Sequence, residues 1–166
     1  MPTERQVSFE EFLRHLEALE MPREIEMVVV HHTESPTATQ YRGIETVAAV
    51  RRFHMEDRGW SDTGYHLMIG PPGDLYLCRP LALEGAHCKG YNTHSIGISY
   101  IANFDHEDPA TYPGMALGQA VVAALLRRFG LGVEAIHFHR EYADKTCPGV
   151  KMELERYRAE VEGRGS

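Results

Sequence analysis

Hydrophobic residues recur at helical spacing in four stretches of the chain. Ser8 stands at the start of the first stretch with Glu11 three residues later, a combination typical of a capped helix start. Gly130 directly follows the third stretch and is expected to end it. The predicted helices cover residues 8–20, 44–56, 115–129 and 150–161.

Short runs of β-branched and apolar residues lie between these helices and predict strands. Residues 70–73 read Gly-Pro-Pro-Gly, turn chemistry that indicates a hairpin between two of the strands. Strands interleaved with helices favour a single α/β domain with a central mixed β-sheet flanked by helices. The predicted strands cover residues 27–30, 65–69, 74–78, 95–101 and 134–138.

The chain of 166 residues fits one domain, and it contains no repeat or Gly/Ser linker. We divide it into an N-terminal helical extension (1–22), a main domain (23–162) and a frayed tail (163–166). Apolar residues make up 43% and charged residues 25%, an ordinary globular balance. A formal charge of −7 without a Lys/Arg run argues against nucleic acid as a partner. No segment is apolar enough for a membrane helix, and residues 1–20 do not resemble a signal peptide.

Histidines and a cysteine at predicted strand ends are candidates for metal binding. His31 ends the strand 27–30, and His139 follows the strand 134–138, with Cys147 eight residues beyond it. Zinc binds imidazole and thiolate, and three such ligands leave a fourth position open for water, as in catalytic sites. On spacing alone, Cys147 is explained equally well as a buried free thiol beside a helix start.

Other candidate residues carry weaker signals. Tyr65 opens a predicted strand after Gly64, so its phenol could project over a metal site or merely pack. His15, His54 and His106 stand in contexts typical of surface residues, and we expect them to be inert. Three cysteines cannot all pair, and the sequence does not decide whether Cys78 and Cys88 form a disulfide.

Five ordered motifs together resemble the type 2 N-acetylmuramoyl-L-alanine amidases, a family that includes zinc-dependent bacteriophage enzymes and the animal peptidoglycan recognition proteins. The resemblance extends from about residue 26 to residue 150. The motifs are Val29-Val30-His31-His32-Thr33, Gly59-Trp60-Ser61-Asp62-Thr63-Gly64-Tyr65-His66, Gly85-Ala86-His87-Cys88-Lys89-Gly90-Tyr91-Asn92, Ser95-Ile96-Gly97-Ile98-Ser99-Tyr100, and His139 to Lys145 with Cys147-Pro148-Gly149.

The resemblance implies a role for each matched residue. His31, His139 and Cys147 would bind Zn²⁺, with Tyr65 and Lys145 as catalytic residues. Residues 23–162 would then form a zinc amidase domain, in which zinc-activated water cleaves the amide between the lactyl group of peptidoglycan and L-alanine. The predicted substrate-binding residues are His32, Gly64, His66, His87, Lys89 and Asn92.

Two alternatives accompany this interpretation. A non-catalytic peptidoglycan-binding module would usually lack the zinc cysteine, whereas Cys147 is present. A cytosolic muropeptide-recycling amidase would carry Asp at the position of Cys147 and Glu at that of Tyr65. The sequence therefore favours a phage-type endolysin, made in the cytoplasm and reaching the cell wall by holin-type release or lysis. Bacterial peptidoglycan is its expected partner, and we expect no obligate protein partner. In the recognition proteins, a residue pair shortly before the Gly-Ala-His segment is linked to the preference for lysine or diaminopimelate as the third stem residue. Here Pro80 and Leu81 stand at that place and match neither familiar pair, so the sequence does not assign the preference.

Overall fold

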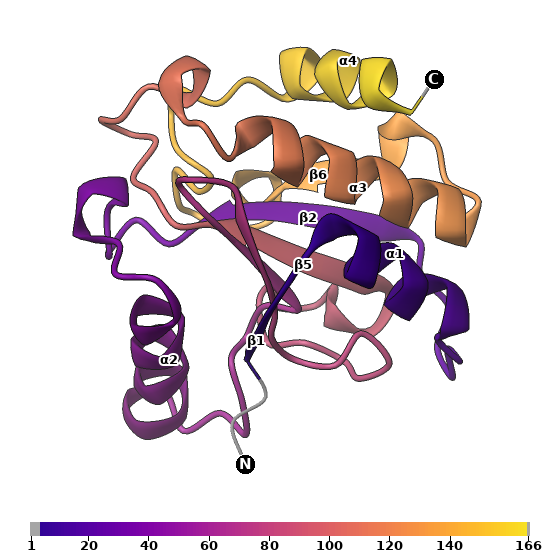
Figure 1. Cartoon of the computed structure of the whole chain (residues 1–166), viewed down its shortest axis with the longest axis horizontal. Coiled ribbons are helices and arrows are strands. Elements are labelled where there is room, and N and C mark those ends of the chain that lie inside the picture. Colours follow the sequence, from indigo (N-terminus) through magenta and orange to yellow (C-terminus); the bar gives the residue numbers. More distant parts are fainter. Residues whose placement is uncertain (1–3, 166) are drawn as a thin grey trace.

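The computed structural model describes residues 4–165 and contains one six-stranded mixed sheet (Figure 1). Its strand order is β1-β4-β3-β5-β2-β6. The strands are β1 (Arg5–Val7), β2 (Met27–His32), β3 (Leu67–Gly70), β4 (Asp74–Leu77), β5 (Ser95–Tyr100) and β6 (Ile136–Phe138). The helices are α1 (Phe9–Ala18), α2 (Ile44–Arg52), α3 (Met115–Phe129) and α4 (Leu154–Arg164).

Parallel strands form the centre of the sheet. β5 lies between β3 and β2 and runs parallel to both, and β6 adds a further parallel strand beside β2. β4 and β1 extend the sheet in antiparallel fashion beyond β3. The carboxyl ends of β2 and β6 therefore lie side by side, which is where sites form in such sheets.

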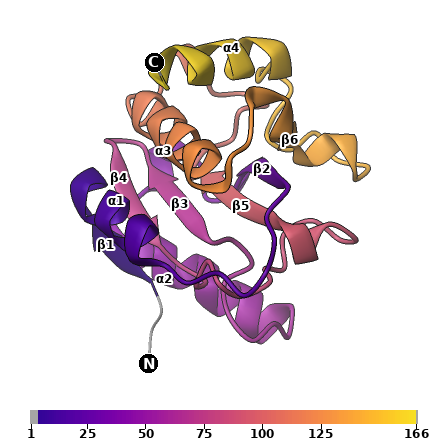
Figure 2. The ribbon, with the colours of Figure 1, turned by 90° about the vertical axis from the view of Figure 1, so that its right-hand side faces the viewer.

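Helices cover both faces of the sheet. α1, α3 and α4 lie on one face, and α2 lies on the other (Figure 2). The larger core joins α1, α3 and α4 to alternate strand residues such as Leu67 and Ile69. The smaller core joins Val47 and Val50 of α2 to Met68, which lies between those two strand residues. This alternation follows from the two-residue period of a strand.

Local signals in the sequence explain where α1 and α3 begin and end. The backbone N–H of Glu11 donates to the Ser8 hydroxyl oxygen over 3.1 Å, which caps α1 as predicted. Gly130 ends α3 in the left-handed conformation, with φ of 67°. The single α/β domain with a mixed sheet is thus confirmed.

Several element boundaries differ from the prediction. β1 was not predicted, because three residues are too few for a recognisable alternation. The predicted helix 44–56 is α2 followed by a π-helical turn at Phe53–Asp57. The predicted helix 150–161 begins later, at Leu154, because the Arg140 guanidinium binds the carbonyls of Gly149 and Met152 and holds that segment in a turn.

The ends of the chain and its cysteines complete the fold. α1 and β1, from the predicted extension, pack into the larger core and the sheet edge. α4 continues to Arg164, inside the segment 163–166 for which we predicted fraying, and Ser166 lies outside the described residues.

All three cysteines are free, so Cys78 and Cys88 do not form a disulfide. Within residues 4–165, no helix is long and apolar enough to cross a membrane.

Candidate active site

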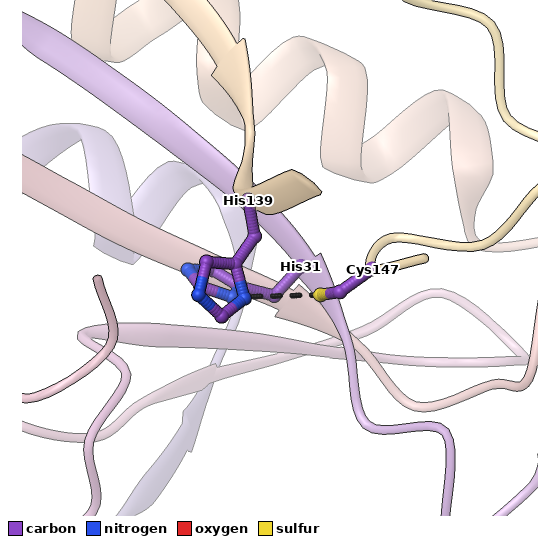
Figure 3. A group of neighbouring side chains, drawn as sticks. All are labelled: His31, His139 and Cys147. Carbon is purple, nitrogen blue, oxygen red and sulfur yellow. Dashed lines mark hydrogen bonds between the residues drawn. The ribbon is translucent and has the colours of Figure 1, made fainter. Parts of the chain in front are cut away.

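The three predicted metal ligands meet at the carboxyl end of the parallel strands (Figure 3). His31 lies near the end of β2, His139 directly follows β6, and Cys147 lies on the loop that leads from there towards α4. Their candidate ligand atoms all lie within 4.8 Å of one another. The residues come from segments far apart in the sequence, and the pairing of β2 with β6 brings two of them together.

The distance between two of these donors fits a shared zinc ion. His31 Nδ1 lies 3.6 Å from the Cys147 sulfur. Two tetrahedral zinc ligands with Zn–N near 2.0–2.1 Å and Zn–S near 2.3 Å are expected to lie about 3.6 Å apart. A set of two imidazoles and one thiolate leaves one tetrahedral position for water or substrate.

Burial determines the charge state of these donors. It lowers the pKa of His31 well below the usual value and that of His139 to about 4, so both imidazoles are neutral and able to bind a metal at pH 7. Burial raises the pKa of the Cys147 thiol to about 12, and the nearby Lys145 opposes this effect. A bound cation would favour the thiolate, since metal binding displaces the thiol proton.

A groove runs past two of the three donors, His31 and His139. The rings of Tyr65 and His31 lie 5.1 Å apart between centroids. Burial raises the pKa of Tyr65, so its hydroxyl stays protonated and can donate a hydrogen bond. Lys145 is exposed at the groove. The groove is lined by His31, His54, Arg58, Trp60, Tyr65, Ala86, His87, Cys88, Lys89, Gly90, Asn92, His139, Tyr142, Ala143 and Lys145.

Three of the predicted substrate-binding residues line this groove, but two of them are already engaged. The Asn92 side-chain oxygen accepts hydrogen bonds from the backbone N–H groups of His87 and Cys88, which folds the loop. Both ring nitrogens of His87 face protein side chains, at 2.9 and 3.1 Å. Lys89 is exposed and available to a ligand. The substrate contacts of these three residues stay predictions.

The other three predicted substrate-binding residues lie outside the groove lining. His32 points to the opposite face of β2 from His31. Its Nδ1 accepts a hydrogen bond from the Phe104 backbone N–H, and its ring lies nearly parallel to the Phe104 ring. His66 accepts from the backbone N–H of Gly97 and faces a carbonyl with its other nitrogen. Gly64 brings its backbone against Ala86, where a side chain would collide. These residues are engaged in hydrogen bonds and close packing within the protein, and their substrate contacts stay predictions.

His54 does not have the surface position that we expected. It is 8% exposed, accepts a hydrogen bond from the Gly64 backbone N–H and packs against Trp60. The π-helical turn at Phe53–Asp57 widens the helix at this point and changes the direction of its side chains, which helical periodicity alone does not predict.

An aromatic contact joins the two loops that border the groove. Tyr91 and Tyr142 lie with their ring centroids 4.1 Å apart. Tyr91 belongs to the loop before β5 and Tyr142 to the loop after β6. Sequence reasoning did not pair them, because each stands alone in its segment and only the fold brings them together.

Comparison with known proteins agrees with this site. The sequence model described as N-acetylmuramoyl-L-alanine amidase matches residues 21–150. A peptidoglycan recognition protein from Trichoplusia ni is 32% identical over 147 residues, covering 83% of this chain and 75% of the relative.

Two solved structures have the same fold. The endolysin N-acetylmuramoyl-L-alanine amidase LysCS from Clostridium intestinale superposes with a TM-score of 0.68 at 26% identity, covering 84% of this chain and 85% of that one. A mutant of Drosophila PGRP-LB in complex with tracheal cytotoxin superposes with a TM-score of 0.67 at 25% identity, covering 82% of each chain.

Proposed function

The chain belongs to the N-acetylmuramoyl-L-alanine amidase family, and from this premise we propose that it is a zinc-dependent peptidoglycan hydrolase. Its reaction is hydrolysis of the amide bond between the lactyl group of the glycan and the L-alanine of the stem peptide. One observation carries the proposal. His31, His139 and Cys147 form a three-donor cluster whose ligand atoms all lie within 4.8 Å of one another, beside an open groove.

The residues around the cluster have complementary tasks in this reaction. When bound, zinc lowers the pKa of a water molecule towards about 7 and polarises the scissile carbonyl. Tyr65, just before β3, and Lys145, on the loop between β6 and α4, both line the groove and supply hydrogen-bond donors. They share two tasks, stabilisation of the negative charge that develops on the carbonyl oxygen and delivery of a proton to the departing L-alanine nitrogen.

Mass spectrometry of peptidoglycan digests tests the reaction. Purified sacculi incubated with the zinc-loaded protein should release stem peptides with free L-alanine amino termini. Chelation with EDTA should stop the release, and added Zn²⁺ should restore it. Cys147→Ser should bind zinc poorly and lose activity, whereas Cys78→Ala, which removes another buried free thiol, should keep both. Digests in which only glycosidic or peptide cross-bridge bonds are cut would refute the proposed chemistry.

Binding of peptidoglycan without cleavage is the second candidate function. It is supported by the relatives named as recognition proteins, one of which was solved with tracheal cytotoxin. A pull-down with insoluble sacculi, run beside the digest, separates the two functions. Retention on sacculi without any new amino termini, in a protein that holds zinc, would favour the binding module.

The route to the cell wall is a proposal of the same kind. The similarity to an endolysin supports synthesis in the cytoplasm followed by holin-type release or lysis. Expression in a bacterial host, with and without a co-expressed holin, tests this route. Lysis that depends on the holin is the expected result, and lysis without it would contradict the proposal.

A further inference from the structure

His87 lies directly against a proposed metal ligand. His31 turns Nδ1 towards the Cys147 sulfur and its other ring nitrogen, Nε2, towards His87 Nδ1, which lies 2.9 Å away. The two rings meet edge to face, with an interplanar angle of 84°. On its far side, His87 Nε2 lies 3.1 Å from the hydroxyl oxygen of Ser95.

Binding of a metal through His31 Nδ1 fixes every proton along this chain of contacts. An imidazole that binds a metal through Nδ1 carries its proton on Nε2. His31 Nε2–H therefore donates to His87 Nδ1, which must be unprotonated to accept. The proton of neutral His87 then stands on Nε2 and is donated to the Ser95 hydroxyl oxygen. Each contact thus has one donor and one acceptor.

The fold holds the His87 ring in this position from several sides. Gly97 of β5 lies beneath it, and a Cβ added at Gly97 would stand 2.5 Å from the ring carbon Cγ. A Cβ at Gly85 would stand 2.8 Å from ring carbon Cδ2. Asn92 anchors the backbone N–H of His87 itself. His87 is only 7% exposed, so packing and hydrogen bonds set the position of its ring.

We propose that His87 is a positioning residue that holds His31 in the tautomer and ring orientation needed to bind the metal through Nδ1. The inference rests on the proposed function and assigns to His87 a task different from the predicted substrate contact. Partners of this kind raise the basicity of a ligating imidazole and commonly change metal affinity by ~10–100-fold. Ser95 and Gly97 act one step further away, by fixing the His87 ring.

Two substitutions of His87 separate this role from simple packing. His87→Leu fills a similar space but removes the acceptor that His31 needs. His87→Asn keeps an acceptor, because the side-chain oxygen of Asn stands near the position of Nδ1. We expect zinc affinity, measured by chelator competition, to fall ~10–100-fold in His87→Leu and to recover most of that loss in His87→Asn. Ser95→Ala is a milder change, and it should weaken zinc binding by a smaller factor.

Controls make each outcome decisive. His94→Leu replaces an exposed histidine on the same loop and should leave zinc affinity unchanged. Urea unfolding of the metal-free variants reports any loss of fold. ¹⁵N NMR of the zinc-loaded wild type should show the His31 proton on Nε2.

Two results would overturn the inference. The first is a zinc affinity that is the same in wild type, His87→Leu and His87→Asn. The second is a zinc-loaded wild type in which the His31 proton lies on Nδ1. A wild-type protein that binds no zinc would instead refute the proposed function itself.

Discussion

Tyr65 and Lys145 reach the candidate metal centre from very different surroundings. Tyr65 precedes β3, packs against the smaller core and has its ring close to that of His31. Lys145 lies on an exposed loop, where its ammonium group is within electrostatic reach of Cys147 and His139. The phenol is therefore held in place by the fold, whereas the lysine supplies charge from the rim of the groove.

Removal of either group should slow the reaction without removing the metal. We expect Tyr65→Phe and Lys145→Ala each to reduce turnover by ~10²–10³, the usual cost of losing one donor to a developing oxyanion. Zinc content, measured by atomic absorption, should stay at the wild-type level in both. If both variants digest sacculi at the wild-type rate, the catalytic assignment is wrong.

At the residue scale, the sequence could predict which donors belong together but not how neighbouring side chains orient them. The order of the motifs predicts that His31, His139 and Cys147 converge, and the structure places them within 4.8 Å. The inward position of His54 depends on a π-helical turn, and the engagement of His87 depends on contacts across the sheet. Neither leaves a periodic signal in the sequence.

At the scale of elements, the fit of α3 on the sheet depends on one glycine. Gly118 of α3 faces Tyr100 of β5, and an added Cβ would overlap the tyrosine ring and hydroxyl. The same hydroxyl lies 2.6 Å from that of Tyr157 on α4. Tyr100 thus contacts both helices and fixes how closely they approach the strand.

Gly118→Ala should destabilise the protein although alanine favours helices. We expect a loss of about 1–3 kcal/mol in the free energy of unfolding, because Tyr100 is fully buried and has little room to move. Gly163→Ala in the last turn of α4 is the matched control, since an added Cβ there meets no atom within 4 Å, and it should be neutral or stabilising by less than about 1 kcal/mol. Urea denaturation measures both, and equal effects would contradict the packing argument.

Elements with a local signal were predicted more accurately than those fixed by distant contacts. The Ser8 cap and Gly130 defined the start of α1 and the end of α3, because both act within a few residues. The start of α4 is set by Arg140, which belongs to another segment. β1 owes its existence to pairing with β4, some seventy residues away in the sequence.

At the scale of the whole molecule, several buried histidines must stay neutral in the folded state. Burial lowers the pKa of His66 to about 3 and that of His54 to about 4, from an ordinary value of 6.5. Between the folded and unfolded pKa values the unfolded chain binds more protons. Stability therefore rises with pH in this range and is lost as pH falls below 6.5.

The metal-free protein should lose stability steeply between pH 6.5 and pH 4.5. Each histidine that is protonated only on unfolding contributes about 1.4 kcal/mol per pH unit to the slope. His66→Asn keeps an acceptor for the Gly97 N–H. It should reduce the slope of unfolding free energy against pH by about 1.4 kcal/mol per pH unit, the contribution of one proton. Urea titrations at a series of pH values in EDTA measure this, and a free energy of unfolding that is flat from pH 7 to pH 4.5 would contradict it.

The fold class could be predicted from the sequence, but the arrangement of the strands could not. Alternating strands and helices indicated a mixed sheet covered by helices, and this is confirmed. The strand order depends on pairings such as β2 with β5 and β6, between segments up to about a hundred residues apart. Hydrophobic periodicity reports burial and carries no information about which strand lies next to which.

The two outermost strands, β1 and β6, are each only three residues long. A second molecule that added a strand at either side would find few backbone N–H and C=O groups to pair with. Aggregation by strand addition is therefore disfavoured at both margins of the sheet. Such short margins limit strand addition without the charged or proline-rich residues that longer edge strands require.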